Sequence, residues 1–262
     1  MVNKIALFMA ALMIMLMTVT GCSIVSGQSK TVNSIKKAGI LIVGVKADVP
    51  GFGYLNPITN QYEGLEIDIA KLIAKEFLGD ESWVKFVTVT SKTRGPMLDD
   101  GSIDMVIATF TITEDRKLIY NFSTPYYTDY IGIMVQKDST FKKLTDLDGK
   151  TIGVVESTST QDALQNVANA SSININFVQF GSSDEARAAL EAGEIDAFSI
   201  GSSILNGYLD NNTRILTERY SPQPLGIATK LNNKDLAQSI DKLINKWLND
   251  GTITGLIQKN HV

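Results

Sequence analysis

Two stretches of the chain, residues 94–108 and 185–199, share one local plan: a short helical pattern, a glycine turn and a strand. The pattern Gly-x-Ile-Asp recurs at residues 101–104 and 193–196, which lie 92 positions apart. Short α/β turns can recur by chance. Two lobes built on the same α/β plan explain the repeat most simply, so the sequence predicts a two-lobed α/β protein.

Two apolar runs support this plan. Residues 39–45 and 149–155 are short and bounded by glycine, as expected of strands buried on both faces of a parallel sheet. A helical stripe of apolar residues lies between them: Ala70, Ile73, Ala74 and Phe77. Ligands of open α/β sheets bind outside the carboxyl ends of the strands, so two facing lobes predict a cleft. Its loops should follow Val45, Ala108 and Val155, and surround Asp196.

Composition excludes several kinds of chemistry. The 262 residues include one cysteine, Cys22, and one histidine, His261, so a disulfide within the chain, a Cys/His metal site and histidine-based catalysis are not expected. The formal net charge of −4 gives no basic surface for nucleic acid. We therefore expect no metal, no cofactor and no nucleic-acid partner.

The first residues have the pattern of an export signal. Lys4 precedes an uncharged run at residues 5–19, which is shorter than the roughly 20 residues of a membrane-spanning helix. Residues 19–22, Val-Thr-Gly-Cys, resemble the bacterial lipobox, which implies cleavage after residue 21 and lipidation of Cys22; the alternative is an ordinary signal peptide with a chance cysteine. Polar residues 22–34 are predicted to form a flexible tether.

Polar residues follow the strand expected to end at Ala108. Thr109 and Thr111 offer hydroxyl groups, and Thr113 is placed to cap a helix whose free N–H groups could bind an anion. Arg116, one helical turn beyond, could donate two parallel hydrogen bonds to a carboxylate. An equally simple interpretation is a capped surface helix with a solvated arginine.

Four motifs in this order carry a family resemblance: residues 64–70, 101–104, 111–116 and 122–127. They resemble the bacterial extracellular solute-binding proteins, family 3, which are amino-acid receptors of ABC importers. The resemblance implies a type II periplasmic-binding-protein-like fold, with two α/β lobes joined by two hinge strands and a ligand between them. On this basis residues 35–134 and 222–262 form lobe 1, and residues 135–221 form lobe 2. Residues 221–224 are a hinge candidate, with Gln223 a further cleft candidate.

The resemblance also implies roles for single residues. Arg116, helped by Thr111, would bind the ligand α-carboxylate, while Asp196 and the Thr109 carbonyl would accept the α-ammonium. Ser159 and Thr160, at the start of a helix in lobe 2, would donate further hydrogen bonds. Lys46 and Arg94 match the cationic positions of aspartate- and glutamate-binding members.

A count of the charges expected in the cleft favours an acidic ligand. Arg116 and Asp196 neutralise a zwitterion, so Lys46 and Arg94 would be left unpaired in a closed cleft unless the ligand were aspartate or glutamate. The alternative is that Lys46 or Arg94 pairs with a protein carboxylate: Asp48, Glu66 or Asp68. For the ligand itself, the alternative is a polar amino acid, with a preference for glutamine or asparagine.

The expected function is therefore that of a monomeric, lipid-anchored receptor on the outer face of the cytoplasmic membrane that delivers its ligand to an ABC permease. An enzyme on the same scaffold, such as a lyase or dehydratase, is the alternative from another class. It would need a tuned acid or base beside the ligand.

Overall fold

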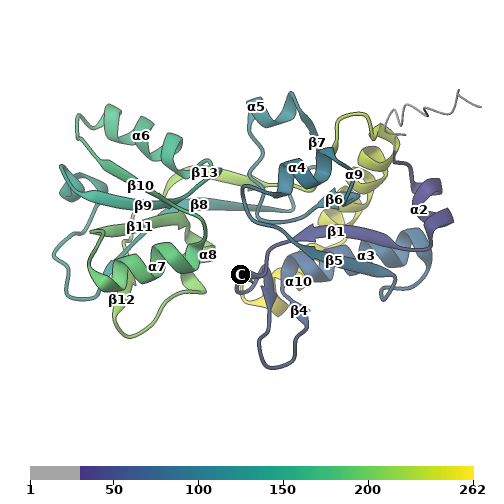
Figure 1. Cartoon of the computed structure of the whole chain (residues 1–262), viewed down its shortest axis with the longest axis horizontal. Helices are drawn as coiled ribbons and strands as arrows, with labels where there is room; N and C mark the ends of the chain where they lie inside the picture. The colour runs from purple at the N-terminus through teal and green to yellow at the C-terminus, as the bar shows by residue number, and fades with distance from the viewer. Residues whose placement is uncertain (1–29) are drawn as a thin grey trace, which may run out of the picture.

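The computed structural model describes residues 30–262. Cys22, the signal peptide and residues 22–29 of the expected tether lie outside the described residues. The described chain forms two α/β lobes side by side, joined by two long strands, as the sequence predicted (Figure 1).

Lobe 1 is built on a five-stranded sheet. In spatial order its strands are β5 (Val84–Thr88), β1 (Leu41–Val45), β6 (Met105–Val106), β14 (Ala228–Lys230) and β7 (Tyr120–Phe122). Strand β1 is parallel to β5 and β6, whereas β14 is antiparallel to β6 and β7. A smaller antiparallel sheet contains β2 (Asp48–Val49), β3 (Gly53–Leu55) and β4 (Tyr62–Glu63). The sheet that carries β1 therefore combines an N-terminal parallel part with a strand that returns from the far end of the chain.

Helices pack around these strands. Those of lobe 1 are α2 (Val32–Ala38), α3 (Leu65–Leu78), α4 (Arg94–Asp99), α5 (Glu114–Lys117), α9 (Lys234–Asn249) and α10 (Thr252–Asn260). Helix α3 buries the apolar stripe expected from the sequence: Ala70, Ile73, Ala74 and Phe77. Helix α5 begins after Thr113, whose side chain accepts a hydrogen bond from the backbone N–H of Arg116 at 3.2 Å. The predicted core helix and the predicted cap are both confirmed.

Lobe 2 has the second large sheet. Its strands are β10 (Asn176–Phe180), β9 (Thr151–Val155), β11 (Ala197–Gly201), β8 (Tyr127–Gln136) and β12 (Thr213–Ile215), with β13 (Tyr220–Leu225) paired to β8. Its helices are η1 (Leu144–Leu147), α6 (Thr160–Ala170), α7 (Ser183–Ala192) and α8 (Ser202–Asn206). Strand β9 is parallel to β10 and β11, as expected for the run at residues 149–155.

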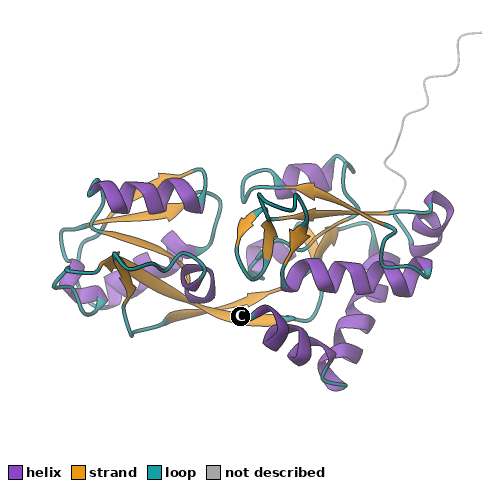
Figure 2. Cartoon of the chain, turned by 90° about the horizontal axis from the view of Figure 1, so that it is seen from below, coloured by secondary structure: helices purple, strands orange, loops and turns teal. Residues whose placement is uncertain are grey.

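Strands β8 and β13 connect the lobes. They are antiparallel, from Tyr127 opposite Leu225 to Ile131 opposite Tyr220. Figure 2 shows the pair crossing from one lobe to the other. The lobe boundaries expected from the sequence, 134/135 and 221/222, fall inside these two strands, because each strand is continuous through the crossing.

The chain enters lobe 1 earlier than the sequence suggested. The expected tether extended to residue 34, but Thr31 caps α2 and Lys30 contacts the lobe. The Lys30 backbone N–H donates to Asn233 Oδ1 at 2.7 Å, and its ammonium lies 2.9 Å from Asp104 Oδ1. Residues 30–34 are held by these partners and are not tether.

The repeated Gly-x-Ile-Asp segments have the same structure in both lobes. The glycine of each turn has a positive φ, 81° in lobe 1 and 74° in lobe 2, a conformation that favours glycine. Asp104 and Ile42 exchange two hydrogen bonds, one from backbone to backbone and one from the Ile42 N–H to the carboxylate at 2.9 Å. Asp196 and Thr151 make the same pair, also at 2.9 Å. The repeated aspartate therefore accepts a hydrogen bond from an N–H near the start of a neighbouring strand.

Candidate ligand-binding site

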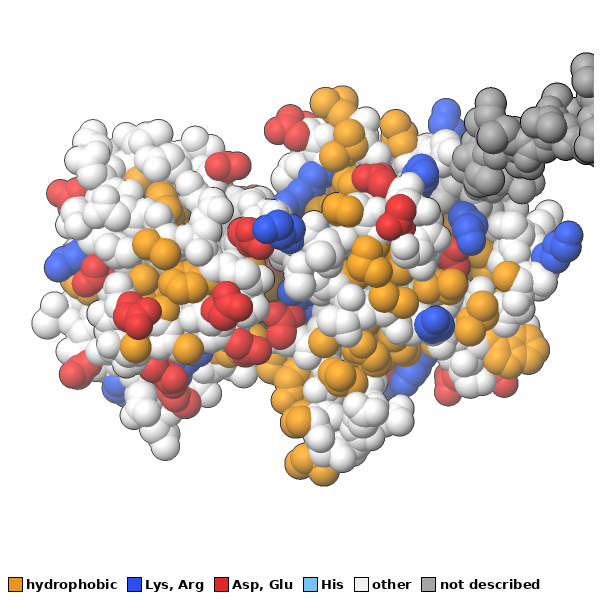
Figure 3. Space-filling view, in the orientation of Figure 1, with side chains coloured by type: hydrophobic (Ala, Val, Ile, Leu, Met, Phe, Trp, Pro, Cys, Tyr) orange, Lys and Arg blue, Asp and Glu red, His pale blue; other side chains and the backbone are white. Residues whose placement is uncertain are grey.

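A cleft lies between the two lobes, where the carboxyl ends of β1, β6, β9 and β11 meet. Figure 3 shows a groove separating the lobes, with basic and acidic side chains facing one another near its middle. The space between its walls amounts to about 520 Å³ when the open mouth is included. Its polar side chains come from both lobes and the strands that connect them: Lys46, Ser91, Arg94, Thr109, Thr111, Asp129, Thr158, Ser159, Thr160, Ser183 and Gln223.

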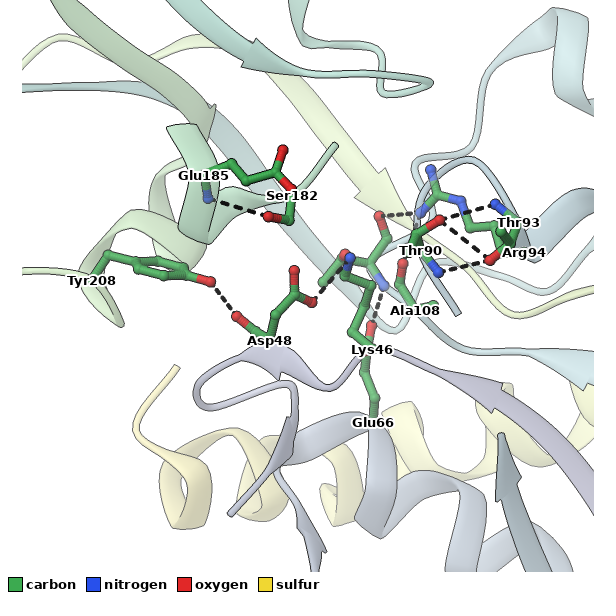
Figure 4. Close-up of polar contacts among 11 residues, drawn as sticks. Lys46, Asp48, Glu66, Thr90, Thr93, Arg94, Ala108, Ser182, Glu185 and Tyr208 are labelled. Carbon is green, nitrogen blue, oxygen red and sulfur yellow. Dashed lines mark hydrogen bonds and ion pairs between the residues drawn. The ribbon is translucent and has the colours of Figure 1, made fainter. Parts of the chain in front are cut away.

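Lys46 follows directly after β1 and is 4% exposed. Its ammonium lies 3.0 Å from Asp48 Oδ1, a contact drawn in Figure 4. The backbone carbonyl of Asp48 accepts a hydrogen bond from the hydroxyl of Tyr208, a residue of lobe 2. Lys46 therefore lies in the cleft, as predicted, but it already has a carboxylate partner.

Arg94, the first residue of α4, is 2% exposed. Its guanidinium donates to the Ala108 carbonyl at 2.8 Å and stacks on the Phe110 ring, with 3.9 Å between Cζ and the ring centroid. A longer contact of 3.4 Å reaches the Ser157 carbonyl in lobe 2. Burial, with the charge of Arg116 as a second cause, lowers the pKa of Arg94 to about 9. Arg94 is therefore a cation at neutral pH, fixed by backbone carbonyls at the cleft wall.

A buried carboxylate stands behind this wall. Glu66, near the start of α3, is fully buried, and its Oε1 accepts hydrogen bonds from the Thr109 backbone N–H at 2.6 Å and the Tyr126 hydroxyl at 2.5 Å. Burial raises the pKa of Glu66 to about 7, and these hydrogen bonds and the charges of Arg94 and Lys46 oppose that rise. Thr109 has a φ of 44°, an uncommon conformation for a β-branched residue, which the hydrogen bond that its N–H donates to Glu66 helps to hold.

Arg116 lines a pocket that adjoins this cleft and shares Thr111 and Ser159 with it. Its guanidinium donates to the Thr111 carbonyl at 2.8 Å and to the Ser157 carbonyl of lobe 2 at 3.1 Å. Its Cζ is 4.8 Å from the Phe110 ring centroid, so Arg94 and Arg116 share one aromatic ring. Burial lowers the pKa of Arg116, with the nearby Asp162 opposing the shift. The arrangement places a guanidinium fork where the two lobes meet.

Lobe 2 contributes a helix end. Ser159 and Thr160 line the cleft at the start of α6, as expected. The Ser159 hydroxyl donates a hydrogen bond to Gln223 Oε1 at 2.5 Å. The Ser159 side chain therefore does not cap α6. Because the first N–H groups of a helix have no partners within it, this end can donate hydrogen bonds to an anion. Gln223, on β13, is a cleft residue as the sequence suggested.

Asp196 lies elsewhere, which corrects its expected position. It precedes β11, and its carboxylate accepts from the Thr151 N–H at 2.9 Å and lies 3.9 Å from the Lys150 ammonium. The cleft is lined by Ile200 and Gly201 at the other end of β11. At about 3.3 Å per residue, the five-residue step from Asp196 to Gly201 spans roughly 16 Å. Asp196 is bound at the amino end of β11, far from the end that lines the cleft, and cannot contact a ligand there.

Asp129, on β8, is the cleft carboxylate that the sequence reasoning missed. It is 3% exposed and accepts from the Tyr130 N–H at 2.8 Å and from the Ser203 N–H and hydroxyl, both at 3.1 Å. Burial raises its pKa. A side chain on the neighbouring Gly201 would overlap the Asp129 carboxylate. A signal existed, since Asp129 is the one charged residue of β8, a strand that is otherwise rich in apolar residues, and a charged residue is seldom buried without a partner or a function.

Two further features of the described residues concern metals and membranes. Between residues 30 and 262, no three His, Cys, Asp or Glu side chains are grouped as metal ligands would be. Over the same residues, no helix has the length and hydrophobicity required to cross a bilayer.

Fold and cleft together define a two-lobed binding protein for a small molecule. The family described as bacterial extracellular solute-binding proteins, family 3, matches residues 41–261. The chain is 40% identical over 218 residues to the glutamine-binding protein of Geobacillus stearothermophilus, covering 82% of each. It is 37% identical over 233 residues to the ABC transporter glutamine-binding protein GlnH of Bacillus subtilis (strain 168), covering 87% of this chain and 84% of that protein.

A solved structure agrees with these relatives. The crystal structure of the cysteine-binding protein from Campylobacter jejuni matches with a TM-score of 0.79 and 29% identity, covering 87% of this chain and 92% of the other. The chain therefore belongs to the bacterial extracellular solute-binding proteins, family 3. It is an exported amino-acid-binding protein of an ABC transporter and not an enzyme. Its partners are an amino acid and the transporter's permease.

Proposed function

We propose that this protein binds glutamine, a zwitterionic amino acid with an uncharged polar side chain, and delivers it to its permease. One observation carries the choice: protein carboxylates already offset the two buried cations of the cleft, one through an ion pair and one through a charge interaction without direct contact. The Lys46 ammonium lies 3.0 Å from Asp48 Oδ1. Arg94 lies close enough to the buried Glu66 for the two charges to interact. The names of the two relatives support the same ligand.

The acidic ligand expected from the sequence depended on Lys46 and Arg94 being unpaired. With Asp48 and Glu66 present, a second negative charge on the ligand would enter a cleft whose cations are already offset. The alternative that paired these cations with protein carboxylates fits the described contacts better, and we propose that it favours the alternative ligands, glutamine or asparagine.

The charged groups of the ligand backbone have complementary partners. In our proposal the α-carboxylate binds the Arg116 guanidinium, the Thr111 hydroxyl and the N–H groups at the start of α6, and takes the place of the Ser157 carbonyl. The α-ammonium binds the Asp129 carboxylate, in the role first expected of Asp196, with the Thr109 carbonyl as a further acceptor. Ser159 and Thr160 complete the side of lobe 2. Each charge of the zwitterion then meets one opposite charge.

A thermal-shift screen over the twenty amino acids tests this proposal. A ligand that binds only the folded protein raises the apparent melting temperature, by more when it binds more tightly at a fixed concentration. We expect the largest rise with glutamine and smaller rises with glutamate and aspartate. A largest rise with either acidic amino acid would contradict the proposal.

We further propose that the protein is anchored through a lipid on Cys22 to the outer face of the cytoplasmic membrane, and that it acts as a monomer. The Val-Thr-Gly-Cys pattern after an apolar run supports the anchor. Because a single acyl chain holds a protein only marginally at a bilayer, stable anchoring through Cys22 needs more than one chain. Residues 22–29 would then link the membrane to Lys30, where lobe 1 begins.

A further inference from the structure

We propose that Glu66, which contacts no ligand atom itself, is the residue that makes the cleft select an uncharged over an acidic ligand side chain. This inference rests on the proposed function and adds the residue that sets its charge preference. Glu66 interacts with three cleft residues. Its Oε1 accepts a hydrogen bond from the Thr109 N–H, and its charge attracts those of Arg94 and Lys46. The negative charge of Glu66 lies directly behind Thr109, a residue of the cleft wall, and offsets the positive charges of Arg94 and Lys46.

Burial makes this charge effective. Glu66 and Arg94 are 0% and 2% exposed, and charges act more strongly where water does not screen them. Glu66 Oε2 and Arg94 Nε have no hydrogen-bond partner among the described residues, so part of each charge is not compensated locally. An ionised Glu66 therefore lowers the positive potential that an acidic ligand side chain would require.

The geometry allows charge and shape to be separated by substitution. Oε1 of Glu66 accepts both hydrogen bonds, from Thr109 and Tyr126, while Oε2 accepts none from the described residues. Glutamine at this position can keep its oxygen on both donors and replace only the unpaired Oε2 with an amide group. Aspartate keeps the charge but is too short by one methylene to keep both bonds.

Calorimetric titration with glutamine and with glutamate at pH 8 tests the inference. We expect wild-type protein to prefer glutamine, and Glu66→Gln to shift the ratio of the two affinities toward glutamate by about tenfold or more. Glu66→Asp should weaken both ligands while keeping the preference for glutamine. Asp104→Asn is the matched control, because Asp104 is a buried carboxylate of the same lobe that accepts a hydrogen bond from the Ile42 N–H outside the cleft. The ratio of glutamine to glutamate affinity in this variant should equal that of wild type.

A pH series on wild-type protein gives a second readout that needs no variant. The groups facing Glu66 are the Thr109 N–H, Tyr126, Arg94 and Lys46; the pKa of Arg94 is about 9 and that of Tyr126 lies well above 10. Since the pKa of Glu66 is about 7, lowering the pH from 8 to 6 protonates it, whereas the side chain of free glutamate, with a pKa of about 4.3, stays ionised. Asp129 would pair with the α-ammonium group, which both ligands have, so its titration would change both affinities alike and leave their ratio unchanged. The glutamine-to-glutamate affinity ratio should therefore fall on acidification in wild type and stay constant in Glu66→Gln.

The outcomes separate the two proposals. A wild-type preference for glutamate would overturn the proposed function itself. A wild-type preference for glutamine that neither Glu66→Gln nor acidification changes would leave that function standing and overturn the role of Glu66.

Discussion

Single residues decide what this cleft can hold, and their partners matter more than their charges alone. Lys46 and Arg94 lie where the sequence placed them, yet a cation with a carboxylate 3.0 Å away, as Lys46 has in Asp48, attracts an anionic ligand far less than a free one. Asp129 is the opposite case, since its hydrogen bonds come from neutral N–H and hydroxyl groups. A ligand ammonium would be its ion-pair partner in the cleft.

Substitution of Asp129 tests that role. We expect Asp129→Asn to weaken glutamine about tenfold or more, because the ammonium loses a buried charge partner. The variant should bind 4-carbamoylbutanoate, which is glutamine without its α-amino group, no more weakly than wild type does. Because a side chain at Gly201 would enter the same space, Asp129→Ser combined with Gly201→Asp should restore much of the glutamine affinity. Equal losses for both ligands in Asp129→Asn would mean that Asp129 only supports the strand.

At the scale of elements, the sequence was a good guide wherever the signal was local. Apolar runs, helical spacing and the Thr113 cap each depend on a few neighbouring residues, and the strands and helices appear where those patterns predicted. Position along a strand was harder to infer. Asp129 lies in β8 and Asp196 directly precedes β11, but only the pairing of these two strands shows which carboxylate reaches the cleft.

The repeated aspartate therefore has a structural role that can be separated from binding. We expect Asp196→Ala to lower the free energy of unfolding by about 1 kcal/mol, because it removes the acceptor of the Thr151 N–H. Urea denaturation measures that loss, and calorimetry on the folded variant should give a wild-type affinity for glutamine. A loss of affinity similar to that of Asp129→Asn would return Asp196 to the binding site.

For the molecule as a whole, the site exists only because two lobes and two connecting strands meet. Contacts across the cleft include Tyr208 to the Asp48 carbonyl, Lys92 to Glu156 at 3.4 Å and Arg116 to the Ser157 carbonyl. The family resemblance supplied this arrangement in outline. The Lys46–Asp48 pair, two positions apart, was among the alternatives that the sequence offered. Partners from the other lobe, such as Tyr208 for Asp48, could not be predicted from one sequence, because they lie up to 160 positions away.

Glutamine titration of Arg116→Ala by calorimetry tests the central claim most directly, which is that an amino acid binds between the lobes through its own charged groups. Lys117→Ala is the control, because Lys117 is the next residue of α5, is exposed and pairs with Glu114 on the same helix. The claim predicts that Arg116→Ala loses about 2–5 kcal/mol of binding free energy, since the ligand carboxylate would lose its cation, and that Lys117→Ala binds as wild type does. Equal affinities of both variants for glutamine would contradict it.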